Sequence, residues 1–108
     1  MKEEFNAIML KVQEWARDKD LDKANTYRQM LKLQKEVGEL AEALLKFGPS
    51  EIINAIGDVM IALTVLCLRL NICGIDECYR LAYEEIKDRK GKTINGVFIK
   101  DGEQNVTK

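Results

Sequence analysis

Residues 51–70 constrain the fold most, because this stretch is apolar in nearly every direction around a helix. A surface helix keeps a polar face toward water, whereas a helix without one must be covered on most sides. We therefore expect it to be the central helix of a bundle or part of a subunit interface. It is not expected to cross a membrane, because Asn54, Asp58 and Arg69 interrupt the roughly 18 apolar residues that a span needs.

Two helices are expected before this central helix. Apolar residues recur at helical spacing over residues 5–16, which predicts the first. The second is expected to begin at Asn25 or Thr26, either of which can cap a helix, and to run to Phe47, where a Gly-Pro pair ends it. Ser50 is then expected to cap the central helix.

The C-terminal part is expected to hold one more helix and a hairpin. The pattern predicts a helix over residues 75–86, closed by the basic run KDRKGK with Gly91 as its stop. Asn95 and Gly96 lie between β-prone segments, which favours a tight hairpin turn. The expected fold is all-α: a four-helix bundle-like single domain over residues 1–108, with a short C-terminal β-hairpin or extended tail, assembling through the third helix.

Composition limits the chemistry. A net charge of −1 gives no general attraction to nucleic acid or to an anionic membrane, so neither is expected as a partner. The chain has no histidine and its three cysteines form no CxxC pair, which argues against a zinc site and favours reduced thiols in a cytoplasmic protein. The N-terminal MKEEFNAIML has acids where a signal peptide would be basic.

Two acids, Glu36 and Asp58, stand where a helical projection expects apolar side chains. On the second helix Glu36 falls within the apolar arc, and Glu39 lies at its edge. On the central helix Glu51, Asn54 and Asp58 follow one stripe. If the two helices pack antiparallel across their short connection, these stripes can face each other and gather several carboxylates in a small space.

Such a cluster predicts a bound cation. Carboxylates that lie close together away from water repel each other, so they take up protons or recruit positive charge. Oxygen ligands without histidine or thiolate favour Mg²⁺ or Mn²⁺. The structural alternative is that Lys32 neutralises Glu36 from one turn away and that Glu51 only complements the dipole at the start of its helix.

Three segments of the chain resemble a known family. They are KLQKEVGELAEAL, EIINAIGDVMIALTVL and YEEIKDRKGKTINGVFIK. Together they resemble the small phage-type, single-domain MazG-like nucleotide pyrophosphohydrolases, over about residues 12–100. The resemblance implies Mg²⁺-dependent hydrolysis of nucleoside triphosphates, either dNTPs or non-canonical NTPs, to monophosphate and pyrophosphate, as a cleansing of the nucleotide pool. It also implies a homodimer or homotetramer.

The resemblance implies roles for individual residues. Glu36, Glu39 and Asp58 take the metal positions, with Glu51 and Asn54 as further candidate ligands. Glu36 and Glu39 are the candidate catalytic residues. The resemblance does not say which of them is the general base, and Glu39 is preferred because it lies at the edge of the apolar arc. The candidates for substrate binding are Lys32, Lys87, Arg89, Lys90 and Lys92 for phosphate, Trp15 for the base, and Asn95. Their structural alternatives are a solvated basic helix end, a core tryptophan and a turn residue.

Two positions depart from the family pattern. Asn54 stands where related sequences carry an acid, and Lys35 replaces a glutamate that is often found beside the first motif residue. An amide oxygen can coordinate Mg²⁺ but brings no charge. The alternatives to an enzyme are therefore a catalytically weak or inactive nucleotide-binding protein and a helical interaction module, a dimer whose third helix forms the interface and whose acids pair with lysines of the partner.

Overall fold

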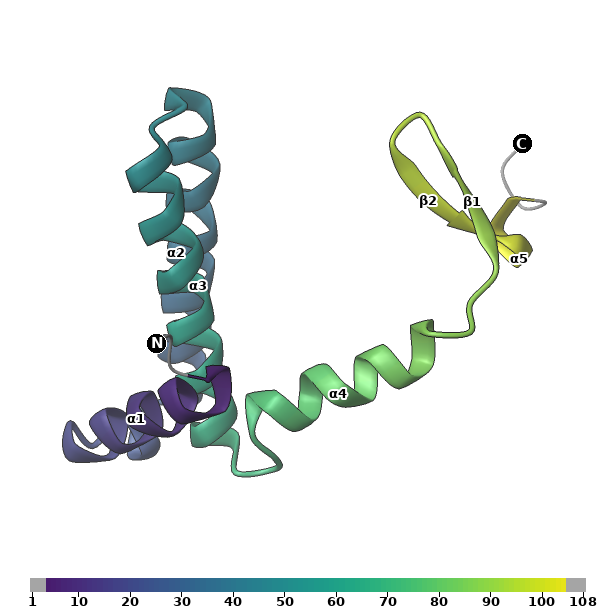
Figure 1. Cartoon of the computed structure of the whole chain (residues 1–108). Helices are drawn as coiled ribbons and strands as arrows, with labels where there is room; N and C mark the ends of the chain where they lie inside the picture. Colours follow the sequence, from purple (N-terminus) through teal and green to yellow (C-terminus); the bar gives the residue numbers. More distant parts are fainter. Residues whose placement is uncertain (1–3, 105–108) are drawn as a thin grey trace. The chain divides into compact units, whose positions relative to one another are not determined.

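A computed structural model describes residues 4–104 and shows an all-α chain that ends in a β-hairpin (Figure 1), which confirms the predicted fold class. The elements in chain order are α1 (Phe5–Asp18), a 3-10 turn η1 (Leu21–Lys23), α2 (Thr26–Lys46), α3 (Pro49–Leu70), α4 (Ile75–Ile86), β1 (Gly91–Ile94), β2 (Val97–Lys100) and α5 (Asp101–Gln104). The chain divides into two compact units, residues 1–77 and 78–108.

The connection between α2 and α3 is tighter than the sequence predicted. Phe47 adopts a left-handed conformation (φ 52°) that ends α2 after Lys46. Gly48 is the N-cap of α3, and Pro49 occupies its first turn, where the missing N–H costs nothing. The prediction of Ser50 as the cap was wrong, because the φ of proline suits a helical position and the helix begins before Ser50.

Small side chains let α2 and α3 pack antiparallel in the first unit (Figure 1). Ala43 of α2 and both Ala55 and Ala62 of α3 are buried. The Gln29 side-chain amide donates to the Ala62 carbonyl at 3.5 Å, and Arg69 Nε donates to the carbonyl of Ala24, just before α2. The start of α2 therefore lies beside the C-terminal half of α3, as the short connection predicted.

The core of this unit is small. α1 packs against α3 and η1 and buries Met9 and Ala16. No large side chain of the described residues is fully buried. Of the most apolar 18-residue stretch of α3, only 22% is buried. By length and composition α3 could cross a membrane, and the core helices of soluble proteins share both properties.

In the second unit, the expected hairpin is present and the expected glycine stop is not. Asn95 (φ 51°) and Gly96 (φ 79°) form the two-residue turn, and Ile94 pairs with Val97. α4 ends at Ile86, whereas Gly91 begins β1. A side chain at Gly91 would collide with the backbone of β2, so this glycine serves the close approach of the strands. α5 was not predicted.

Candidate functional site

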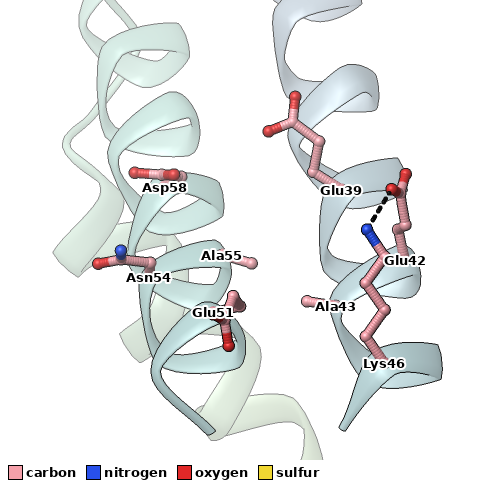
Figure 2. Close-up of a pocket in the computed structure, with 8 residues that line it drawn as sticks. All are labelled: Glu39, Glu42, Ala43, Lys46, Glu51, Asn54, Ala55 and Asp58. Carbon is pink, nitrogen blue, oxygen red and sulfur yellow. Dashed lines mark hydrogen bonds and ion pairs between the residues drawn. The ribbon is translucent and has the colours of Figure 1, made fainter. Parts of the chain in front are cut away.

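A first hollow lies in the groove between the end of α2 and the start of α3 (Figure 2). It encloses about 400 Å³. Its lining holds four carboxylates and one ammonium group, and we call it the acidic hollow. The residues are Glu39, Glu42, Ala43 and Lys46 of α2 and Glu51, Asn54, Ala55 and Asp58 of α3.

The helix–helix contact at the acidic hollow sets where its polar groups point. Ala43 and Ala55 point toward each other between the helices, whereas the amide of Asn54 is directed away from α2 (Figure 2). The carboxylate of Glu51 folds back onto the start of α3. Its Oε2 atom lies so close to Gly48 that a side chain at position 48 would overlap it. The placement of Glu51 therefore agrees with the structural role of an acid at a helix N-terminus.

A second hollow of about 630 Å³ lies between α1, α2 and α3. Its lining combines an indole, two basic side chains, two acids and aliphatic groups, and we call it the mixed hollow. The residues are Trp15, Leu21, Ala24, Asn25, Arg28, Gln29, Lys32, Glu36, Asp58, Ile61, Ala62 and Val65. Asp58 lines both hollows, so it forms part of a shared wall between them.

Glu36 lies inside, as the helical projection predicted. Its exposed fraction is 7%, and Glu36 is the one buried charged residue among the side chains that the structure describes. Lys32 Nζ lies 3.6 Å from its Oε1 and is itself more than half exposed. That distance is beyond an N–H···O hydrogen bond, so Lys32 supplies charge to Glu36 without a close contact.

The other glutamates of α2 are also paired, but in water. Lys35 lies 3.8 Å from Glu39, and Lys46 lies 3.1 Å from Glu42, at a side-chain exposure of about half or more in every case. Exposed pairs of this kind contribute little to stability. Both pairs balance the charge of these glutamates within α2, and burial is what separates Glu36 from its neighbours.

The structure divides the predicted metal ligands between the two hollows. Glu36 lines the mixed hollow and Glu39 the acidic one, and only Asp58 borders both. Across residues 4–104, no three acids or cysteines lie together closely enough to hold a metal ion as they stand. The donor chemistry nevertheless fits Mg²⁺, which binds one or two carboxylates and completes its shell with water and phosphate. Glu39 and Asp58 are exposed and can reorient.

The predicted substrate-binding residues fall in different units. Trp15 is 48% exposed and lines the mixed hollow, so it is not a core residue. The basic candidates of the C-terminal part are exposed in the second unit, where Lys87 pairs with Glu84 at 2.9 Å and Asn95 forms the hairpin turn. Their role in substrate binding stays a prediction. The candidates of this group are Lys87, Arg89, Lys90, Lys92 and Asn95.

Sequence reasoning did not single out Arg28. This residue lies one turn before Lys32 and two turns before Glu36, and all three line the mixed hollow. The spacing of four residues places them on one side of α2, a signal that was present in the sequence.

Comparison with known proteins gives one distant relative. An "Uncharacterized 18.2 kDa protein in rep-hol intergenic region" of Haemophilus phage HP1 is 28% identical over 75 residues. The match covers 68% of this chain and 46% of the phage protein, so the chain spans less than half of that relative. No family model matches the chain, and no solved structure matches it.

Proposed function

We propose that the protein is a Mg²⁺-dependent pyrophosphohydrolase that converts nucleoside triphosphates, either dNTPs or non-canonical NTPs, to the monophosphate and pyrophosphate. The observation that carries the proposal is the buried carboxylate of Glu36 on the same side of the α2–α3 pair as Asp58. Burying an ionised acid costs several kcal/mol unless a cation offsets it, and Lys32 offsets it only partly from 3.6 Å. A second cation at this position is therefore favourable.

In this proposal the metal is held by Glu36, Glu39 and Asp58, with Glu51 and Asn54 nearby. Mg²⁺ supplies neutralisation of the phosphate charge and activation of a water molecule, and Mn²⁺ can supply the same chemistry. Glu39 is exposed at the rim and has its charge balanced by Lys35 alone, so it is the carboxylate best placed to accept a proton from water. Glu36 orients the site because its surroundings restrict its side chain.

A helical binding module without turnover is the second candidate. The three lysine pairs along α2 favour it, because each of Glu36, Glu39 and Glu42 already has a cation one turn away. Asn54 favours it as well, since that position brings no charge to the groove. A nucleotide-binding protein with weak or no activity lies between the two candidates.

A test of turnover separates these candidates. The protein is incubated with canonical and modified dNTPs, with Mg²⁺ or with EDTA, and pyrophosphate and monophosphate are measured. We expect both products from at least one substrate in Mg²⁺ and none in EDTA. If a high concentration of protein releases neither product from any nucleotide, the hydrolase proposal is wrong.

Assembly through α3 belongs to the same proposal. One side of α3 carries apolar side chains at alternating spacings of three and four residues, the spacing of a coiled-coil seam. Three of them are 45% to 71% exposed, and the other three are intermediate. A second copy of the chain, in a homodimer or homotetramer, would cover this seam. Its residues are Ile53, Ile56, Met60, Leu63, Cys67 and Leu70.

Light scattering after size-exclusion chromatography tests this assembly. The wild-type protein should elute as a dimer or tetramer, and Ile53→Glu should shift it toward the monomer because a charge at the seam is costly to bury. The matched control is Lys35→Glu on the exposed side of α2, which should leave the mass unchanged. A monomeric wild-type protein at high concentration would contradict the assembly.

A further inference from the structure

On the basis of the function proposed above, we propose that Lys35 competes with the metal ion for Glu39, so that this lysine lowers the affinity of the site for Mg²⁺. Its ammonium group lies 3.8 Å from Glu39 Oε2, one helical turn away. Glu39 is a candidate metal ligand and lines the acidic hollow, whereas Lys35 lines neither hollow. The lysine therefore balances the charge of this carboxylate from outside the candidate site.

The order of the two residues along α2 indicates that their pair does little for the helix. An ion pair of residues four apart supports a helix best when the acid precedes the base. Glu42 and Lys46 have that order and form a hydrogen bond of 3.1 Å (Figure 2). Lys35 and Glu39 have the reverse order and lie beyond hydrogen-bond distance. Helix stability therefore accounts for the first pair and not for the second.

The side chains of Lys35 and Glu39 can separate at little cost. Lys35 is 65% exposed and Glu39 is 50% exposed. An exposed pair of this kind is weak, because water screens it and because fixing two long side chains costs conformational entropy. A divalent cation carries twice the charge of an ammonium group and coordinates a carboxylate oxygen directly. It therefore replaces the ammonium group at Glu39, and Lys35 returns to water.

Lys32 differs from Lys35 in what its partner requires. Glu36 is 7% exposed, so the charge of Lys32 offsets part of the cost of its burial. Glu39 has no such cost to offset, because its carboxylate remains in contact with water. Substitution of Lys35 should therefore change the affinity for the metal with little effect on the fold.

Binding of Mn²⁺ in the absence of nucleotide tests the competition. The EPR signal of free Mn²⁺ is lost when the ion binds to a protein, so a titration gives the Kd without turnover. Lys35→Gln should lower the Kd about two- to fivefold, because the ion no longer has to displace an ammonium group. Lys35→Arg keeps the positive charge and should have the Kd of wild type or a higher one.

The matched control is Lys19→Gln, which changes the net charge by the same amount. Lys19 is exposed directly after α1 and lines neither hollow, so this variant should bind Mn²⁺ as the wild type does. An equal gain in Lys19→Gln would show that only the net charge matters. That result, or an equal gain in Lys35→Arg, would overturn the specific role of Lys35.

These outcomes can be told apart from a failure of the proposed function. If wild type and Lys35→Gln bind Mn²⁺ equally well, the competition is wrong and the hydrolase proposal stands. If Lys35→Gln binds more tightly but the turnover assay yields no product, the competition is supported and the hydrolase proposal is contradicted. If neither protein binds Mn²⁺, the metal site is wrong and both proposals fail with it.

Discussion

The acidic and mixed hollows share Asp58 and the α2–α3 pair, yet their glutamates differ in burial and in the distance to the nearest lysine. Glu42 at the acidic hollow is exposed and forms a 3.1 Å hydrogen-bonded pair with Lys46. Glu36 at the mixed hollow is 7% exposed and lies 3.6 Å from Lys32. The glutamate with the poorer contact is the one that is buried, so its pair with lysine does not by itself account for its position.

This difference teaches that the sequence spacing of ion pairs is a weak guide to function. Both pairs join residues four apart on the same helix, and both would be drawn as equal bridges on a helical projection. The desolvation of Glu36 is the physical difference, because a buried charge costs free energy that an exposed charge does not. Tests of the two hollows should therefore compare matched changes on the two sides of Asp58.

The largest expected effect comes from Glu36→Gln compared with Glu42→Gln. Pyrophosphate release should fall by about 100-fold or more in the first variant, because a metal ligand and its charge are lost, and should stay near wild type in the second. The melting temperature of metal-free Glu36→Gln should stay unchanged or rise, since a buried charge is removed. Equal losses of activity in both variants would contradict a catalytic role for Glu36 that Glu42 does not share.

The metal-free melting temperature also judges the structural alternative. If Glu36→Gln clearly destabilises the metal-free protein while Glu42→Gln does not, the pair with Lys32 supports the fold. The buried acid would then be explained without a metal ion. Calorimetry in EDTA gives this comparison directly.

A smaller effect, on stability, is expected from Ala55→Leu at the base of the acidic hollow. Ala55 is 7% exposed and faces Ala43, so a leucine there should force α2 and α3 apart and lower the free energy of unfolding by about 1–3 kcal/mol. Ala41→Leu, on the exposed surface of α2, is the control and should change stability by less than about 0.5 kcal/mol. Urea denaturation measures both. A tolerated leucine at position 55 would show that the helices are not held close by their alanines.

Much of the fold could be predicted because its signals are local. Helical periodicity over residues 5–16 and 75–86 and the Asn95-Gly96 turn each depend on neighbouring residues, and all were found. The errors at Ser50 and Gly91 arose where two roles compete for one residue type. The position of Gly91 after a helical pattern predicts a helix stop. The close approach of the partner strand, which requires the glycine, depends on the hairpin and not on the neighbouring residues.

The candidate site was predicted in part, for a similar reason. The burial of Glu36 follows from one helix and its apolar arc, so the sequence was enough. The division of the acids between two hollows depends on how α2 is rotated against α3, which no single-helix pattern contains. The folding back of Glu51 and the outward direction of Asn54 follow from that packing and from the glycine at position 48.

The smallest expected effect comes from Asn54→Asp, which places a further acid at the rim of the acidic hollow. The new carboxylate would lie one turn from Asp58, and like charges at that spacing cost about 0.2–0.5 kcal/mol in a metal-free helix. A bound Mg²⁺ relieves that repulsion, so the variant should melt slightly below wild type in EDTA. Mg²⁺ should stabilise the variant more than wild type. The variant should have a few-fold lower Kd for Mg²⁺ or a faster turnover. Because the Asn54 amide is directed away from α2, an unchanged titration would place position 54 outside the metal site and confine that site to the wall around Asp58.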